Sequence, residues 1–231
     1  MPLTFDGRLV QPGRNEAPTL RDIALSLSRI PRFGGHTRRW WSVLDHSVFV
    51  YLLAVEMDKR EYHDLSLALL LHDAHETMTG DVPSDVKLPE MRVQQREFDT
   101  AIVREHFVPL GMDAWMELKP FVKEYDRRAL HAEAWLLGPP GLIDADDDTY
   151  ERVYGFGKRP FTFKQDCNFL ARIRMDATIF QQRPDAGING VNVRQFILKV
   201  QALQNLIAEQ PHRLLVRREP MNDVGSLGQP V

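Results

Sequence analysis

The residues best suited to chemistry lie where a long apolar segment turns polar. The run LALLL (67–71) leads directly into His72, Asp73 and Glu76. On a continuous helix, residues four apart share a face, so His72 and Glu76 would lie together. Asp73 would lie about 100° further round. His46 opens another apolar segment, where the positive end of a helix dipole favours the neutral imidazole that binds metals.

Asp126 lies in a third predicted helix and completes a candidate ligand set. Three helices would then each deliver ligands to one point, with His46 and His72 giving nitrogen and Asp73 and Asp126 giving oxygen. Such a mixed set suits Mn²⁺, Fe²⁺, Co²⁺, Ni²⁺ or Zn²⁺, and octahedral geometry leaves positions open for substrate or water. The pattern therefore indicates a site for one divalent transition metal per chain.

Each of these residues also has a structural interpretation. His72 could be a histidine at a helix end that is hydrogen-bonded only to neighbouring carboxylates. His46 could be a satisfied core histidine, and Asp126 could pair with an adjacent arginine on the surface. Clusters of this kind indicate function only probabilistically, so the residue types alone leave both interpretations open.

The composition indicates an ordinary globular protein. The chain has 231 residues, of which 43% are hydrophobic and 26% charged, and its formal net charge is −3. This charge gives no basic surface for stable nucleic-acid binding. No apolar run approaches the roughly 20 residues that cross a bilayer. One cysteine and no apolar signal-peptide core fit a reducing compartment. We therefore expect a cytoplasmic, non-membrane protein whose function depends on a site.

The hydrophobic periodicity is helical from Thr19 onward, which predicts an all-α fold. Thr19 with Asp22, and Ser42 with Asp45, have the spacing of capping boxes at helix starts. Gly80 suits the end of the helix that carries the His-Asp pair. Helices are predicted at about 19–30, 42–55, 64–79, 89–107, 119–137, 166–181 and 192–209.

The chain divides by composition into four parts. Residues 1–18 form an arm in which Asp6-Gly7 suggests a small β-like hairpin. Residues 19–140 form the helical core, and 141–210 a helical C-terminal extension that packs on the core. Residues 211–231 carry little periodicity and are expected to be a flexible tail.

Four segments occur in an order that resembles a known superfamily. They are SRIPRFGGHT, SVLDHSV, ALLLHDAHETMTGDVPSDVK and VKEYDRRALHAEA, between about residues 20 and 137. Together they resemble the HD-domain phosphohydrolases, and most closely the bacterial and prophage 5′-deoxynucleotidase-like branch. The HDxxE…GDxPxxxK block, placed after a histidine-bearing helix, is specific. The resemblance implies an HD-type helical bundle, and also homodimerisation, which is common in that family.

The resemblance also implies roles for individual residues. Arg32 and Phe33 match an arginine–aromatic pair at the substrate pocket. The best-studied nucleotidases have tryptophan at the second position, where it helps to reject a ribose 2′-hydroxyl, so Phe33 makes the preference for deoxyribose less secure. The implied metal ligands are His46, His72, Asp73 and Asp126, and the implied catalytic acids are Glu76 and Asp81.

This combination predicts metal-assisted hydrolysis of a phosphate ester. Glu76 would orient or deprotonate a water, and Asp81 would lie near the leaving group. Arg32 and Lys87 are candidates to bind the phosphate. One of the polar residues that flank His46 would support its imidazole (Ser42, Asp45 or Ser47). The simpler alternatives are that Glu76 only orients His72, that Asp81 is a turn residue, and that Lys87 is a solvated surface lysine.

The predicted function is a 5′-nucleotidase that converts 2′-deoxyribonucleoside 5′-monophosphates to deoxynucleoside and phosphate. A triphosphohydrolase acting on dNTPs at the same site is the first alternative. A dinuclear site would need further histidines, and the spacing of His75, His106 and His131 does not match the dinuclear motif. The remaining alternatives are a non-catalytic nucleotide-binding HD module and a partner-binding role for residues 141–231.

Overall fold

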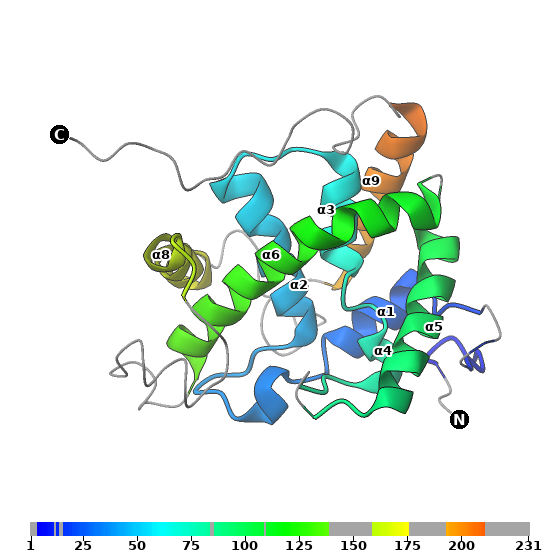
Figure 1. Cartoon of the computed structure of the whole chain (residues 1–231), viewed down its shortest axis with the longest axis horizontal. Coiled ribbons are helices and arrows are strands. Elements are labelled where there is room, and N and C mark those ends of the chain that lie inside the picture. Colours follow the sequence, from blue (N-terminus) through cyan, green and yellow to red (C-terminus); the bar gives the residue numbers. More distant parts are fainter. Residues whose placement is uncertain are drawn as a thin grey trace.

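Helices supply nearly all the regular structure of the residues that the structure describes, as the sequence predicts (Figure 1). The structure is a computed structural model, which describes residues 4–11, 13, 16–83, 86–108, 110–138, 159–175 and 193–210. Within these ranges, the recorded β-structure amounts to isolated bridges, such as the antiparallel bridge between Pro31 and Ser42. The predicted N-terminal hairpin is a tight turn without strands, in which Gly7 N–H donates to Thr4 O and Thr4 N–H donates to Arg8 O, both at 3.0 Å.

The first helices begin at the predicted capping boxes. Both boxes are present, with Thr19 and Asp22 before α1 and Ser42 and Asp45 before α2. The helices that build the core are α1 (Leu20–Leu27), α2 (Val43–Leu52), α3 (His63–Leu71), α5 (Pro89–His106) and α6 (Gly111–Leu137). A short 3₁₀ helix, η1 (Arg32–Gly35), lies between α1 and α2.

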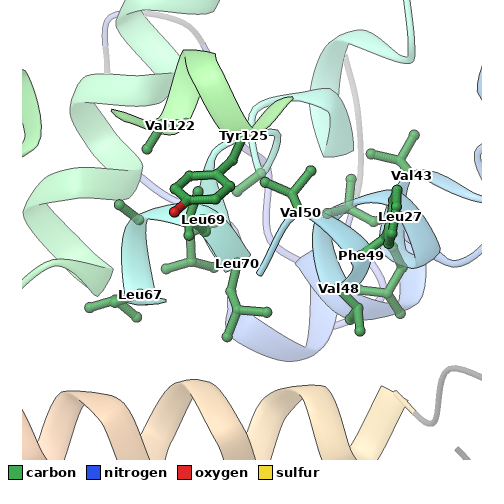
Figure 2. Close-up of a cluster of buried hydrophobic side chains, with 14 of the residues drawn as sticks. Leu27, Val43, Val48, Phe49, Val50, Leu67, Leu69, Leu70, Val122 and Tyr125 are labelled. Carbon is green, nitrogen blue, oxygen red and sulfur yellow. The ribbon is translucent and has the colours of Figure 1, made fainter. Parts of the chain in front are cut away.

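The helices α2 and α3 are buried on every side, which explains why their sequences are apolar all round rather than amphipathic. Both pack against α6, and α3 also packs against α9 (Val193–Glu209). Figure 2 shows Val122 and Tyr125 of α6 above Leu67, Leu69 and Leu70 of α3, with the α2 residues alongside. The middle of α6 is thereby fixed over α2, which carries His46, and over α3, which leads into His72.

The predicted helix 64–79 is interrupted. After α3 ends at Leu71, the hydrogen bonds change from i→i−4 to i→i−3, as in Ala74 N–H to Leu71 O (3.0 Å) and Glu76 N–H to Asp73 O (2.9 Å). A separate short helix, α4 (Glu76–Thr79), follows, and Gly80 ends it with a φ of 74°. The prediction of one continuous helix is therefore wrong, and the His-Asp pair lies in a tight turn between two helices.

The predicted start of the 119–137 helix is also too late, because α6 begins at Gly111 and contains Pro120 in its interior. Proline usually marks a helix start or break, and here the helix continues past it. The α2 helix runs on into a π-helical turn, η2 (Leu53–Met57), where Asp58 N–H donates to Leu53 O at 3.1 Å. This turn brings Asp58 to α6.

The C-terminal helices lie against the core. The α8 helix (Phe163–Met175) packs on α6, and α9 packs on α3 and α1. The predicted 192–209 helix matches α9, whereas the end of the predicted 166–181 helix lies outside the described residues. The domain boundaries at 18, 140 and 210 stay predictions, and the expected flexible tail 211–231 also lies outside the described part.

In the part of the chain that the structure describes, no helix combines the length and apolar character that a membrane crossing requires.

Candidate functional site

Three elements bring the four predicted metal ligands together. His46 lies in the first turn of α2, His72 and Asp73 lie in the turn after α3, and Asp126 lies in the middle of α6. His46 Nε2 is 3.1 Å from Asp126 Oδ1 and 3.5 Å from Asp73 Oδ2. His72 Nε2 is 3.1 Å from Asp73 Oδ2 and 4.0 Å from Asp126 Oδ1. We call these four side chains the centre.

The two imidazoles present the same nitrogen to the centre. His72 Nδ1 donates to the carbonyl oxygen of Leu69 at 2.8 Å, and a carbonyl can only accept, so Nδ1 carries the proton. His46 Nδ1 is 2.9 Å from the carboxylate of Glu133. Both Nε2 atoms are buried and have no well-aligned hydrogen-bond partner among the described residues. Two buried nitrogens in this arrangement fit coordination of a metal ion.

The charges around His46 support the same conclusion. Burial and the Arg32 guanidinium both lower the pKa of His46, but the carboxylates of Glu133 and Asp126 outweigh them and raise it to about 10. The imidazole therefore takes up a proton to compensate the surrounding negative charge. A divalent cation would supply that charge instead and needs the neutral imidazole.

The pKa values of the other three members of the centre are shifted in the directions that keep the imidazoles protonated and the carboxylates charged. Burial lowers the pKa of His72, but Asp73 and Asp126 outweigh it, and the net shift is upward. Burial would raise the pKa of both carboxyl groups, yet His72 holds the pKa of Asp73 well below its usual range. The His46 imidazole, 3.1 Å away, likewise lowers the pKa of Asp126. Two anionic carboxylates thus face two imidazoles, which is a donor set for a divalent ion.

The centre is reached from the side of Asp126. The side chain of Asp126 is 41% exposed, whereas that of His46 is fully buried. Arg127 pairs with Glu124, and Arg128 pairs with Asp58 and Asp166, whereas Asp126 Oδ1 lies 3.1 Å from His46 Nε2. This contact favours Asp126 as a member of the centre over the alternative that it only pairs with an adjacent arginine.

The two predicted catalytic acids lie on either side of Gly80. Glu76 begins α4 and is buried, and its Oε2 has no hydrogen-bond partner in the described ranges. Burial, and then the carboxylates of Asp73 and Asp81, raise the pKa of Glu76 to about 9. Asp81 lies just beyond α4 and pairs with Arg32, with 3.2 Å between Oδ1 and Nη1. Glu76 therefore holds a proton at neutral pH in the metal-free protein.

Arg32 and Phe33 occupy η1, next to the acids. The Arg32 side chain reaches Asp81 through Nη1 and Glu133 through Nη2, which is 3.7 Å from Oε2. Its Nε is buried and has no hydrogen-bond partner within the described residues. Phe33 has a φ of 55°, in the left-handed region that side chains larger than glycine rarely adopt, and its ring lies 5.4 Å from the guanidinium. Strain of this kind concentrates at functional sites.

Lys87 has a contact away from the centre. Its ammonium donates to Gln95 Oε1 of α5 at 3.1 Å. Within the described residues, no recorded contact joins Lys87 to the four side chains of the centre. Its predicted role in phosphate binding stays a prediction without geometric support.

Glu133 is a residue of the site that the sequence patterns did not predict. Support for His46 was expected from Ser42, Asp45 or Ser47, but Ser42 and Asp45 bond to each other in the capping box. The residue that faces His46 Nδ1 is Glu133, which is fully buried on α6. Glu133 follows Asp126 by seven residues, about two helical turns, so it shares a face with Asp126. That spacing could have identified it.

A second group of possible ligands adjoins the first. Asp73, His75 and Glu76 also bring ligand atoms within 4.8 Å of one another. His75 Nδ1, however, lies 3.2 Å from Asp99 of α5. The group also shares Asp73 with the centre, so it adds no independent ligand set.

Comparison with known proteins shows what this region is similar to. Residues 27–137 match the family model described as "HD domain", and this segment contains every residue of the centre. The uncharacterised protein YfdR of Escherichia coli (strain K12) is 33% identical over 90 residues, which are 38% of this chain and 46% of that protein. The match thus spans less than half of its curated relative. HD domains bind divalent metals and are typical of metal-dependent phosphohydrolases, whereas neither match identifies a 5′-deoxynucleotidase branch.

Proposed function

We propose that the HD domain at residues 27–137 hydrolyses phosphate monoesters, and that its substrates are 2′-deoxyribonucleoside 5′-monophosphates. One observation carries the proposal. The buried Nε2 atoms of His46 and His72 face the carboxylates of Asp73 and Asp126 at 3.1–4.0 Å. This is a donor set for a divalent ion, at a place that opens to solvent.

His46, His72, Asp73 and Asp126 would hold one Mn²⁺, Fe²⁺, Co²⁺, Ni²⁺ or Zn²⁺ ion. Such an ion polarises a phosphoryl oxygen and lowers the pKa of a bound water. The protein contributes the geometry, because α2, the turn after α3 and α6 are fixed by the core around α2 and α3.

Glu76 and Asp81 would divide the two proton transfers of the hydrolysis. A water oxygen attacks phosphorus and loses a proton to one carboxylate. The bond between phosphorus and O5′ breaks, and the other carboxyl group protonates O5′. Glu76 suits an exchangeable proton, because it is buried beside Asp73 and Asp81, and Arg32 fixes the position of the Asp81 carboxylate.

Arg32 and Phe33 would bind the substrate. The planar guanidinium suits two phosphoryl oxygens, and its buried Nε has no partner within the described part of the chain. The Phe33 ring would then crowd the sugar and favour deoxyribose.

The charge of the site favours a monophosphate over a triphosphate. Arg32 contacts two carboxylates, those of Asp81 and Glu133, so part of its positive charge is already compensated. A triphosphate brings more negative charge than a monophosphate into a site already lined by Asp73, Glu76 and Asp126. Removal of triphosphate from a dNTP is therefore the second candidate, and the experiment below separates the two.

The test is phosphate release by chelator-stripped protein after Mn²⁺, Co²⁺, Ni²⁺, Zn²⁺ or Mg²⁺ is added back. The panel contains matched dNMPs, NMPs and dNTPs, and phosphate is resolved from longer products. Metal-dependent phosphate release from dNMPs supports the proposal, and equal rates on NMPs would remove the role of Phe33. Release of tripolyphosphate from a dNTP would instead show that the protein is a triphosphohydrolase. A bound metal without any turnover would favour the non-catalytic module.

Metal stoichiometry separates a mononuclear from a dinuclear site. We expect one ion per chain, because the second possible group shares Asp73 and its His75 faces Asp99. Two tightly bound ions per chain would contradict this. Homodimerisation stays a prediction, which sedimentation analysis of the same preparation would test.

A further inference from the structure

Glu133 occupies a position whose burial is costly. The side chain is fully buried on α6, between the buried residues Ala132 and Ala134. Removing a carboxylate from water costs several kcal/mol unless it is compensated. An apolar side chain at this position would avoid that cost. Stability of the helix packing therefore does not explain a glutamate here, and its contacts must be considered.

Both contacts of Glu133 lead to the proposed active site. Oε1 is 2.9 Å from His46 Nδ1. Oε2 is 3.7 Å from Arg32 Nη2 and has no hydrogen-bond partner among the described residues. Arg32 in turn reaches Asp81 with Nη1, so its guanidinium lies between the two carboxylates. Arg32, proposed above to bind the phosphate, thereby also compensates the buried charge of Glu133.

The two imidazoles of the centre are held by chemically different acceptors. A neutral main-chain carbonyl, that of Leu69, accepts from His72 Nδ1. The acceptor for His46 Nδ1 is a carboxylate. A carboxylate behind a histidine fixes its tautomer and makes its other nitrogen a better electron donor than a carbonyl does.

We propose that Glu133 is a positioning residue that acts through His46. It keeps the proton of His46 on Nδ1 and keeps Nε2 directed at Asp73 and Asp126. It also makes His46 Nε2 a stronger electron-pair donor to a metal ion than His72 Nε2. The inference rests on the proposed metal-dependent function. Its test, however, uses metal binding and not turnover, so it can fail or succeed separately from the assignment of the substrate.

A purely structural role is the competing explanation. Glu133 could simply link α6 to α2 and η1 through His46 and Arg32. In that case, substitutions would lower thermal stability but leave the metal affinity of the folded protein unchanged. Metal affinity and thermal midpoint together therefore separate the two roles.

The first experiment measures Zn²⁺ affinity of chelator-stripped protein by competition with a metallochromic dye. We expect about tenfold weaker binding in Glu133→Gln, which keeps an acceptor oxygen, and about 100-fold weaker binding in Glu133→Met, which has none. The matched control is Glu124→Gln, an exposed glutamate on the same helix that pairs with Arg127, and it should bind like the wild type. Unchanged affinity in folded Glu133→Gln would overturn the proposal, even if Glu133→Met does not fold.

The second experiment observes the imidazole protons in Zn²⁺-loaded protein with ¹⁵N-labelled histidine. His72 Nδ1–H, held by the Leu69 carbonyl, is the internal reference and should stay unchanged. The Nδ1–H resonance of His46 should move upfield or broaden by exchange in Glu133→Gln. An unmoved His46 signal would overturn the proposal, because it would show that Glu133 does not accept from His46 Nδ1 in the metal-loaded protein.

Discussion

Asp126 and Arg128 are two residues apart on α6, yet they belong to two clusters of charged residues that differ in how completely their polar atoms are hydrogen-bonded. Arg128 donates to Asp166 through Nε (3.0 Å) and Nη2 (2.7 Å), and to Asp58 through Nη1 (2.6 Å). Tyr125 adds a bond to Asp58 at 2.8 Å, and Thr162 adds one to Asp166 at 2.7 Å. We call these five residues the Arg128 cluster. Its carboxylates and its guanidinium are satisfied by the protein itself.

The centre and its neighbours are not satisfied in this way. Within the described residues, no well-aligned hydrogen-bond partner is found for His46 Nε2, His72 Nε2 or Glu76 Oε2. Buried polar groups without partners are rare in proteins and need an explanation. The comparison teaches that a satisfied cluster stabilises the packing of α8 on α6, whereas an unsatisfied cluster indicates the place of a ligand.

The largest expected effect comes from removing a member of the centre. His72→Ala or Asp73→Ala should reduce phosphate release to background and abolish metal binding at the same time, because the ion loses a ligand. Phosphate assays and metal analysis after dialysis test this. His36→Ala, at an exposed histidine, is the control. A variant that keeps the metal in full would show that the centre is not the binding site.

Glu76→Ala should separate catalysis from metal binding. Loss of a group that transfers protons typically lowers the rate by about 10²–10⁴-fold. The metal content should stay at the wild-type level, because the four ligands remain. Steady-state kinetics and metal analysis of one preparation measure both. Retained turnover would refute the catalytic role of Glu76.

The Arg128 cluster should show the opposite behaviour. Breaking a buried ion pair costs about 3–5 kcal/mol, so Arg128→Ala should lower the free energy of unfolding by that amount. Arg127→Ala is the matched control, since its pair with Glu124 is partly exposed and such pairs are worth less than about 1 kcal/mol. Chemical unfolding measures both. Metal affinity of folded Arg128→Ala should stay unchanged, and a parallel loss of affinity would break the comparison.

The last prediction concerns pH. The pKa of His46 is about 10 in the folded metal-free protein against an ordinary value of 6.5, so its protonation stabilises the fold. This contribution is complete below about pH 6.5 and is lost as the pH rises through 10. The pKa of Glu76 is also raised, from an ordinary 4.5 to about 9, because the folded state disfavours the charged carboxylate. Its protonation therefore also stabilises the fold at low pH, and this contribution is lost as the pH rises through 9.

Metal-free protein should therefore lose stability between pH 6.5 and 9. Metal affinity should rise over the same range, because the ion competes with the imidazole protons. Unfolding curves with chelator and with saturating Zn²⁺ test both statements. A flat profile of the chelated protein would contradict the assigned shifts.

Local sequence patterns predicted much of the fold. The two capping boxes, the helix at about 89–107 and the helix at 192–209 follow from short-range spacing and agree with the structure. The start of α6 and the interruption after Leu71 do not follow from it. Pro120 has a strong local signal that tertiary packing overrides, and the i→i−3 turn at His72 has no residue type that marks it.

The residues of the candidate site likewise divide into those that the sequence patterns predicted and one that they did not. The motif resemblance named the four residues that the structure brings together, and His72 and Asp73 are neighbours in the chain. Glu133 contacts His46 across 87 residues, so no local pattern could join them. Only the two-turn spacing from Asp126 could have indicated that Glu133 lies on the same face of α6.

The π-helical turn Leu53–Met57 requires a fixed number of residues more strictly than it requires particular residue types. Asp58 follows this turn directly and reaches Arg128 from there. Deleting one residue from the turn would restore regular α-helical winding and rotate Asp58 by about 100° around the axis of α2. Many apolar substitutions should be tolerated at these positions, whereas a single-codon deletion should not. In the descent of this sequence, insertions and deletions should therefore be counter-selected here even where residue identity drifts.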